Sequence, residues 1–575
     1  MLSFQELAAQ SEYGLQFHSD SNIEKFDNDL DQNFEDSISV RQYLATFIYE
    51  LHSRHFLEAA VDSMWLIDST YHAQLHLGSK YEDFEIKYKN PKDGKIKRIT
   101  SYNQLANTKA DLLTNAENNG YPFAEVYLKK LNLDNENFQG ELVFKNNQLI
   151  LIDEIKIYGN AKVDPSFLNF YLDLKKGDAL DFSKVRKAQQ KLQNLNFVKS
   201  SREPKMLFDK AGADIYFFLE DRKASRFDFL LGILPINDPL IERNNIITTL
   251  ALIDLHNSFD KGEHIYAKFE QLKPITQELE LKASLPYLLD SPFGVSTSFD
   301  LYRQDSAFID IDYQLGVRYF LDGQNHLEVF VNRSVTNVLS IASQSIINNR
   351  QLPRYLDRQQ NSLGVKLKAN QLDYVFNPTM GWDLFVSAQY GRKNILKNND
   401  LLELQDPTEP EFNFESLYDP LSLAQNQLKL VVDFAYFIPI GKNYSVQLRL
   451  RGGSLFSDGD LLSNEQFRLG GAKFLRGFDE QIFFVDKYLL GTLEYRLLIG
   501  RNTYGFVFAD IAQTEDRSVG TNSSMRPLGF GAGFSFDTKT GIFNISLALG
   551  KDLINDNDFF DIAAPKIHLG YVSLF

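Results

Sequence analysis

Polar and apolar residues alternate with a period of two over most of the chain after Ala224. In the clearest stretches, every second residue is apolar and the residues between them are mostly charged or polar: Leu279, Leu281, Ala283 and Leu285; Leu363, Val365, Leu367 and Ala369; Tyr444, Val446, Leu448 and Leu450. This period belongs to a β-strand with one apolar and one polar face. About sixteen such segments lie in residues 224–575, and about 9–11 residues suffice for a tilted strand to cross a bilayer. The pattern predicts a transmembrane β-barrel of antiparallel strands, with lipid outside and water inside.

A soluble β-sandwich would show the same alternation, so the choice depends on further features. Aromatic residues stand near many predicted strand ends, where they suit the interfacial girdles of a membrane barrel: Tyr436, Phe437, Tyr488 and Tyr571. The last predicted strand runs from Pro565 to the terminal Phe575. These features favour the barrel.

The connections between the predicted strands differ in length. The polar inserts Ser340–Arg358 and Asn394–Leu423 are long, and we expect them to be external loops. The tight segment Pro439–Lys442 resembles a periplasmic turn.

The first 223 residues carry a diverged repeat that contains helices. A helical apolar face runs through Val40–Leu51 and leads to His55–Val61, which aligns with Gly120–Val126 and, in a third copy, with Asn196–Val198. Short strand-like runs follow each aromatic residue, and a further strand opens each unit. We therefore expect three small α+β domains of order β-α-α-β-β, at residues 12–82, 83–150 and 151–222.

Composition narrows the functional classes. The net charge of −16 argues against a nucleic-acid partner. The absence of cysteine excludes disulfides, thiolate metal sites and a lipidated N-terminal cysteine. Mean hydropathy is −0.28 and no apolar run reaches 18 residues, so no transmembrane helix is expected. Residues 1–10 lack a basic start and an apolar core, so we expect any secretory signal to have been removed or to lie upstream.

No constellation of catalytic residues stands out. The nine histidines show no cluster at metal-ligand spacing, and Gly470-Gly471 is not followed by the lysine of a phosphate loop. We expect a protein that is not an enzyme, with no catalytic, cofactor-binding or metal site and no cofactor.

The segment Phe467–Glu480, FRLGGAKFLRGFDE, holds the most specific signal in the chain. Glycines allow tight backbone turns, so Arg476 at this tip is a tethered cation that can reach into a cavity. On the following strands, parity directs Glu494 and, if the aromatics beside it line the lumen, Asp510 to the inside of the barrel. We expect Arg476 to latch the loop inside the lumen through these carboxylates; the alternative is an exposed arginine with a weak surface pair.

These residues resemble the BamA/TamA superfamily of POTRA-containing outer-membrane barrels, and TamA-like assembly factors most closely. The resemblance rests on Gly470, Gly471, Arg476, Gly477 and Phe478 in the sixth external loop, on Phe508 and Asp510 in an F-x-D strand, on the glycine-rich run Arg526–Gly533, and on the terminal Phe575. One departure is Ala512, where the family usually has glycine. The order of the N-terminal repeats resembles POTRA domains, whose exposed sheet edges accept an extended client strand.

The resemblance implies a location in the outer membrane of a Gram-negative bacterium, with the N-terminal domains in the periplasm. It implies outer-membrane lipids and unfolded outer-membrane or secreted proteins as partners, and a periplasmic or inner-membrane partner through the POTRA domains. In the family the first and last strands meet in a seam that opens sideways. Here proline and glycine would weaken that seam, and we assign to it Gly232, Pro235, Gly570 and Phe575.

Three functions remain open from the sequence. The first is an assembly factor that inserts or translocates outer-membrane proteins by β-augmentation at POTRA edges and at the seam. The second is a two-partner secretion exporter of one dedicated client, which usually has two POTRA domains and a plug helix. The third is a passive porin or surface adhesin, for which three periplasmic repeats have no evident use.

Overall fold

The structure, a computed structural model, describes residues 13–19, 33–91, 93–134, 137–222, 224–235, 245–271, 276–353, 355–374, 377–459, 461–471, 474–479, 482–518, 522–538, 541–554 and 565–572. The chain forms two compact units. One holds the residues up to Glu154 together with Lys176–Ser183 and Leu207–Asp214. The other holds Ile155–Lys175, Lys184–Met206 and the residues from Ile215 onward.

The first small sheet has the order β2-β1-β4-β3 and is covered by one helix. Its elements are β1 (Tyr13–Ser19), β2 (Asn33–Phe34), α1 (Ser37–Ser53), β3 (Ala60–Ile67) and β4 (Thr70–His76). The apolar face predicted from the sequence is the face that α1 buries, through Val40, Leu44, Phe47 and Leu51. Asp36 caps the helix by accepting a 2.7 Å hydrogen bond from the Ser39 amide.

The second small sheet repeats this arrangement with the order β6-β5-β8-β7. It comprises β5 (Asp83–Lys89), β6 (Ile96–Ile99), α2 (Tyr102–Glu117), β7 (Glu125–Asp134) and β8 (Asn137–Lys145). The prediction of two helices in every unit was wrong here: a short hairpin strand, β6, stands where the first helix was expected. The turn at Asn90–Lys95, with Gly94 at φ +67°, returns the chain to pair with β5, so the sequence there forms a hairpin.

The third small sheet has the predicted order of two helices between its first and second strands. It contains β9 (Ile152–Gly159), α3 (Pro165–Leu172), α4 (Phe182–Gln193), β10 (Val198–Phe208) and β11 (Ala213–Asp221), with sheet order β10-β11-β9. In all three sheets the first strand lies beside the last. Among the described residues no helix combines the length and the apolarity that a membrane crossing needs.

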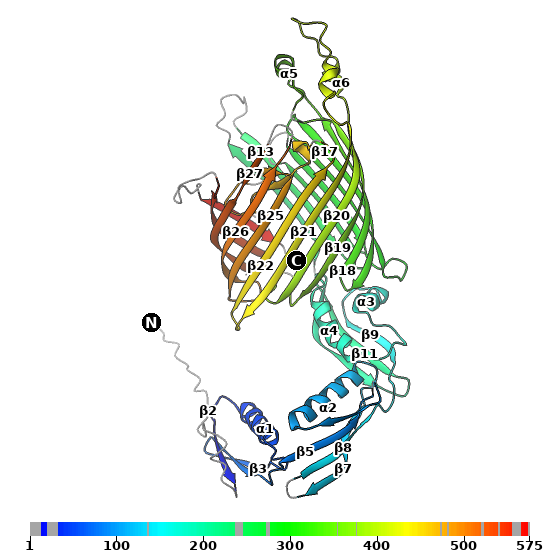
Figure 1. The fold of residues 1–575 in the computed structure, drawn as a ribbon, viewed down its shortest axis with the longest axis vertical. Coiled ribbons are helices and arrows are strands. Elements are labelled where there is room, and N and C mark those ends of the chain that lie inside the picture. The colour runs from blue at the N-terminus through cyan, green and yellow to red at the C-terminus, as the bar shows by residue number, and fades with distance from the viewer. Residues whose placement is uncertain are drawn as a thin grey trace. The chain divides into compact units, whose positions relative to one another are not determined.

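From Arg226 onward the chain forms one large sheet, in which strands follow in sequence order (Figure 1). The short strands β23 and β24 form a separate sheet. The strands of the large sheet are β12 (Arg226–Pro235), β13 (Asn245–His256), β14 (His264–Gln271), β15 (Gln277–Leu285), β16 (Phe293–Gln304), β17 (Phe308–Asp322), β18 (Asn325–Val338), β19 (Arg358–Leu372), β20 (Gly381–Ile395), β21 (Ala424–Ile440), β22 (Tyr444–Ser457), β25 (Lys487–Leu498), β26 (Tyr504–Asp516), β27 (Ser523–Met525), β28 (Pro527–Thr538), β29 (Gly541–Asp552) and β30 (Lys566–Val572).

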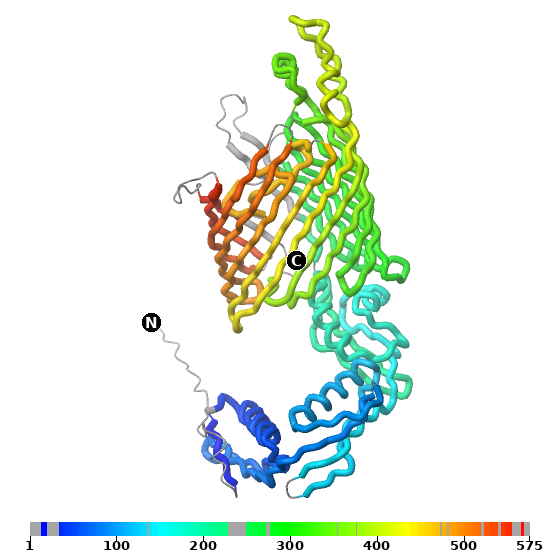
Figure 2. Tube along the Cα trace, viewed as in Figure 1, coloured from blue at the N-terminus to red at the C-terminus, as the bar shows by residue number. Residues whose placement is uncertain are grey.

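The sheet is the predicted antiparallel barrel. Its strands pair antiparallel with one another, and β27 and β28 pair in succession with β26 as one interrupted strand. The Cα trace in Figure 2 shows the strands as tilted neighbours running around a barrel wall. Tilt is required for a sheet to close in this way.

The two faces of each strand differ as the alternation predicted. On β18, Val329 and Val331 are 48% and 54% exposed, whereas Glu328 and Phe330, which alternate with them, are 1% and 2% exposed. The outward apolar row is the surface that lipid covers. The inward row carries charge, and Arg318 and Lys366 from the two neighbouring strands both pair with Glu328.

The assignment of aromatic residues to the membrane girdles was wrong for two of the four. Tyr436 is outward and 44% exposed, but Phe437 and Tyr488 are 6% and 8% exposed and face inward. Phe437 packs with Leu372 and Ala435, and Tyr488 packs against the loop described below. A position near a strand end does not fix the face, because adjacent residues point to opposite sides. The side chain of Tyr571 lies outside the described residues.

Both long inserts extend beyond the strand ends and contain short helices (Figure 1). The β18–β19 connection contains α5 (Ser343–Asn349), and the β20–β21 connection contains α6 (Asn399–Leu402) and the 3-10 helix η2 (Phe414–Tyr418). Together they bury a small core that includes Ile346, Leu401 and Phe414. The two inserts therefore form one packed structure.

We predict that lysine destabilises the barrel at one position of β18 and is tolerated at the next. Val331→Lys places a charge on the lipid face and is expected to cost about 2–4 kcal/mol near the bilayer midplane. Asn332→Lys is the matched control, because Asn332 lines the lumen, where it accepts a hydrogen bond from Gln389. Urea unfolding in lipid vesicles measures both; equal destabilisation by the two variants would contradict the assignment of faces.

Candidate functional site: a loop anchored in the barrel lumen

The connection between β22 and β25 folds back as a hairpin. Among the described residues, its two short strands, β23 (Phe467–Leu469) and β24 (Phe483–Val485), pair only with each other. Gly470 and Gly471 follow β23 with φ of +116° and +85°, a region that favours glycine. The two glycines thus start the turn that carries the chain to Arg476. We call residues 461–485 the lumen loop.

The guanidinium of Arg476 is held by two carboxylates. Its Nε and Nη2 donate to Asp510 Oδ2 and Oδ1 at 2.7 and 2.8 Å, and its Nη1 donates to Glu494 Oε2 at 2.6 Å. The ring centroid of Phe508 lies 3.5 Å from Cζ of Arg476, so the cation also stacks on an aromatic face. The side chains of Arg476, Glu494 and Asp510 are 14%, 8% and 1% exposed. Arg476 and Asp510 thus form a buried, bidentate ion pair, and Glu494 supplies a second carboxylate to the same guanidinium.

Strand parity explains why the carboxylates face the loop. Glu494 lies on β25 between Leu493 and Tyr495, which are 52% and 41% exposed on the lipid side. Asp510 lies on β26, directly opposite Thr492, whose hydroxyl donates to Asp510 Oδ1 at 2.8 Å. Asp510 also accepts from the backbone amide of Arg476 at 3.2 Å. The aspartate therefore fixes the loop backbone as well as the side chain.

Glycines on the loop and on β28 let the two backbones touch. Gly477 has φ +95°, and a Cβ there would lie 2.5 Å from the carbonyl oxygen of Leu549 on β29. A Cβ on Gly529 of β28 would lie 1.8 Å from the Arg476 carbonyl oxygen. The glycine-rich run Arg526–Gly533 thus supplies a surface against which the loop tip fits.

An apolar cluster holds the base of the lumen loop beside the ion pair. Leu469, Leu475 and Val485 of the loop pack with Tyr488, Leu490 and Ala512 of the wall. Ala512, the departure from the family's glycine, is 2% exposed within this cluster. Apolar neighbours accommodate the methyl group of Ala512. Alanine at this position therefore does not displace Asp510, which lies two residues earlier on β26.

Sequence reasoning missed a second anchor near the start of the loop. Lys393 on β20 donates to Glu465 Oε1 at 2.7 Å, and the two side chains are 0% and 3% exposed. Glu465 Oε1 also accepts from the Leu462 amide at 2.6 Å, and its Oε2 accepts from Gln427 at 3.0 Å. The alternation of residues on β20 does direct Lys393 to the lumen. Alternation alone, however, does not identify its partner, Glu465, 72 residues further along the chain.

A third contact joins the loop to β16 and β17, which come earlier in the barrel sheet than the strands named above. Arg468 pairs with Asp310 of β17 at 3.5 Å and lies over the ring of Tyr302 of β16, 4.3 Å from its centroid. The lumen loop is therefore bound to β16 and β17, to β20 and β21, and to β25 and β26.

The loop tip also contacts the last described strand. The Gly477 amide donates to His568 Nε2 at 3.2 Å, and Asp479 pairs with Lys566 at 2.6 Å; both partners lie on β30. Among the residues assigned to the seam, Gly232 and Pro235 lie on β12 opposite Thr248 and Asn245, and Gly570 lies on β30 opposite Asn544. Phe575 lies outside the described residues. Within the described parts of the chain no pairing joins β12 to β30.

The expectation that no histidines cluster at metal-ligand spacing was wrong for one place. Asp254 and His256 on β13 and His264 on β14 bring three ligand atoms within 4.8 Å of one another. Asp254-Leu255-His256 places two ligands on one strand face, and the short turn to His264 returns the third to that face. The three residues therefore have the spacing of ligands on a β-hairpin, which differs from the spacing of metal ligands on a helix or in a loop.

The fold defines the class of protein: an outer-membrane β-barrel preceded by small α+β domains of POTRA type. The Omp85 superfamily domain matches residues 257–570, more than half of the chain, and the protein belongs to the Omp85 superfamily. Proteins of this family insert or translocate other proteins at the outer membrane and are assembly and transport proteins. The barrel lies in the outer membrane of a Gram-negative bacterium and the N-terminal domains lie in the periplasm.

Three solved structures that match this chain are the following. Haemophilus ducreyi BamA lacking POTRA domains 1–3 matches with 14% identity and a TM-score of 0.43, covering 85% of this chain and 98% of that chain. CdiB from Acinetobacter baumannii matches with 15% identity and a TM-score of 0.49, covering 81% of each chain. CdiB from Escherichia coli matches with 12% identity and a TM-score of 0.49, covering 92% and 96%. No curated protein matches the sequence.

Removing the Arg476 side chain is expected to destabilise the barrel strongly. Arg476→Ala leaves the buried Asp510 without its cation and leaves Glu494 paired only with Arg496, at a cost of about 3–5 kcal/mol for a buried pair. Arg449→Ala is the matched control, because Arg449 also pairs bidentately with an inward aspartate, Asp433, but both side chains are about 30% exposed. There the expected loss is about 0–1 kcal/mol.

Denaturant unfolding in detergent measures these losses. Charge reversal provides the second arm: Arg476→Asp and Asp510→Arg singly should destabilise, and the double variant should recover part of the loss. Single variants as stable as wild type would contradict the buried pair.

The second anchor gives an independent prediction. Lys393→Met keeps the length of the side chain but leaves Glu465 buried without its cation, so we expect a loss of about 3–5 kcal/mol. Lys397→Met is the control: Lys397 pairs with Glu415 at 2.6 Å, but the pair is exposed at the surface, so little change is expected. Unfolding midpoints that fall equally for both variants would contradict the assignment of Lys393 as an anchor.

Proposed function

We propose that the protein is an assembly or translocation factor that guides client proteins by β-augmentation, at the sheet edges of its N-terminal domains and at a seam between β12 and β30. The observation that carries this proposal is the lumen loop, which is anchored by Arg476, Asp510 and Glu494 and reaches the last described strand through its tip. The resemblance to TamA-like factors supports the same conclusion.

The N-terminal sheets offer edges suited to an extended client. Within the part of the chain that the structure describes, strand β7 pairs only with β8. Most of its residues are exposed, and Leu131 and Leu133 are 49% and 52% exposed. Strand β3 is the equivalent edge of the first sheet, with Leu66 and Ile67 about half exposed. An added strand would satisfy the free main-chain groups and cover these side chains. Both edges carry a β-bulge, which limits uncontrolled pairing.

The seam would work through the same chemistry. Strand β12 ends at Pro235, which cannot donate a ladder hydrogen bond, and β30 carries Gly570, which weakens pairing. Since the loop tip bonds to His568 and Lys566 of β30, the latch and the seam share one strand. We propose that the Arg476 latch holds the loop while the seam exchanges strands with a client.

Two other functions fit parts of the molecule. A two-partner secretion exporter would use the same barrel to pass one client through the lumen, and the Omp85 domain is compatible with it. A passive porin is less well supported, because the lumen loop and its ion pairs occupy space that a porin leaves to solute. Large, steady conductance of the wild-type protein in planar bilayers would favour the porin.

Locking the seam tests the proposal. One cysteine is placed in Ser225–Leu234 and one in Lys566–Leu574; the sequence has no cysteine that would interfere. Oxidation is expected to lower outer-membrane protein levels, and a reductant should restore them. The control locks β18 to β19 through Val331→Cys and Leu363→Cys, which are strand partners away from the seam. If outer-membrane protein levels are unchanged with the seam locked, lateral opening is not the mechanism.

A further inference from the structure

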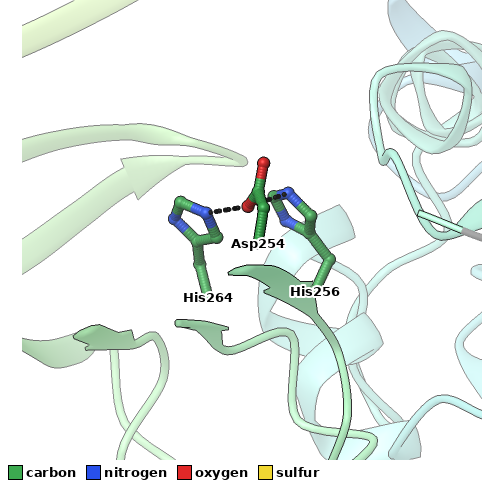
Figure 3. Close-up of side chains that lie close together, drawn as sticks. All are labelled: Asp254, His256 and His264. Atoms are coloured by element: carbon green, nitrogen blue, oxygen red, sulfur yellow. Dashed lines mark hydrogen bonds and ion pairs between the residues drawn. The ribbon is translucent and has the colours of Figure 1, made fainter. Parts of the chain in front are cut away.

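A compact group of two imidazoles and one carboxylate lies at the hairpin of β13 and β14. His256 Nε2 and His264 Nε2 lie 3.1 and 2.7 Å from Asp254 Oδ1 (Figure 3). The two rings are stacked, with centroids 4.3 Å apart and planes 9° apart. Both histidines therefore present the same ring nitrogen to one point.

The position of each ligand follows from strand register. His256 and His264 are direct partners across β13 and β14, and Asp254 lies two residues before His256 on the same face. Leu252, two residues earlier again, is buried, while Ile253 is 38% exposed on the other face. The three ligands consequently face the lumen, close to the end of β13 that leads into the turn.

The turn between the two histidines is fixed by its own hydrogen bonds. Glu263 Oε1 and Oε2 accept from the amides of Phe259 and Lys261 at 2.6 and 3.1 Å, and Asn257 Oδ1 accepts from Gly262 at 2.8 Å. The Asn257 side chain donates to the carbonyl of Lys162 at 2.8 Å, which joins the turn to the third small domain. A turn held this way keeps His256 and His264 in register without a bound ligand.

We propose that Asp254, His256 and His264 bind a divalent transition-metal cation, for which zinc is the best-fitting class. Two imidazoles and a carboxylate are a common zinc ligand set, and they leave a fourth position for water. The side chains are 18%, 38% and 17% exposed for His256, His264 and Asp254, so solvent reaches the site. Softer thiolate-selective metals are disfavoured, since the chain has no cysteine.

The two aspartate–histidine distances are close to those of a zinc site, and all three ligand atoms lie within 4.8 Å of one another. Ligand atoms of a tetrahedral zinc site lie about 3.3–3.5 Å apart, given metal–ligand distances of about 2.0–2.1 Å. The observed nitrogen–oxygen distances of 2.7 and 3.1 Å are shorter by roughly 0.2–0.8 Å, so each imidazole must move slightly away from Asp254. The cation would take the place of the hydrogens that now join the imidazoles to Asp254. Arg226 approaches Oδ2, at 3.5 Å, and leaves Oδ1 to the imidazoles.

A bound cation would link β13 to β14 beside β12, at the hairpin that contacts the third small domain. This consequence is independent of the proposed client handling. It predicts that zinc stabilises the hairpin of β13 and β14.

Zinc titration of the purified full chain, followed by isothermal calorimetry, tests the site. We expect one zinc per chain, and at least a tenfold loss of affinity in each of Asp254→Asn, His256→Gln and His264→Gln. His72→Gln is the matched control, because His18 and His72 form another imidazole pair, with ring nitrogens 2.9 Å apart, and should leave zinc binding unchanged. A heat-modifiable shift in gel mobility checks that each variant is folded.

X-ray absorption on the zinc-loaded wild type provides a readout that needs no variant. It should show two imidazole ligands at about 2.0–2.1 Å. The proposal is overturned by the absence of saturable one-to-one binding, by a spectrum without imidazole, or by binding that survives in the folded His256→Gln, His264→Gln double variant. Loss of zinc in His72→Gln alone would assign the metal to the other histidine pair and equally overturn it.

Discussion

A cation buried in the barrel lumen constrains the rest of this structure. The Arg476 guanidinium is removed from bulk water, and only carboxylates placed on adjacent strands compensate for that desolvation. The requirement fixes the register of β25 against β26, because Glu494 and Asp510 must both face inward as diagonal neighbours, with Asp510 opposite Thr492 and Glu494 opposite Phe508. It also requires glycine on β28, since the loop backbone touches the wall there. A loop, a strand pair and a glycine-rich strand are thereby linked through one side chain.

The lumen loop is attached at several points of different strength. The pair of Lys393 with Glu465 is fully buried, whereas Arg468 and Asp310 are separated by 3.5 Å and partly exposed. The contacts of Gly477 and Asp479 with β30 connect the tip to the edge of the described sheet. A segment held strongly at its base and more lightly at the last strand would allow that strand to change partners while the loop stays in place.

Much of this architecture was predictable from the sequence, and the failures have physical causes. Period-two alternation predicted the barrel and the inward direction of Glu494, because strand geometry alone determines which residues share a face. The girdle assignment of Phe437 and Tyr488 was wrong, because it rested on nearness to a strand end, which does not determine the face on which a residue lies. The hairpin strand β6 was missed because Asn90–Lys95 holds a turn signal that the repeat alignment overrode. Lys393 and Glu465 could not be matched, because a sequence gives the face of each charge but not the height at which two distant strands bring charges together.

The central claim is that the lumen loop resides inside the barrel, held by its buried ion pair. Hydrogen–deuterium exchange of the full chain in lipid nanodiscs measures this directly, through peptides that cover residues 461–485. The account predicts slow exchange at the Arg476 and Gly477 amides, comparable with the neighbouring strands β25 and β26, because these amides donate to Asp510 and His568. Exchange within seconds, at the rate of a solvated external loop, would contradict it.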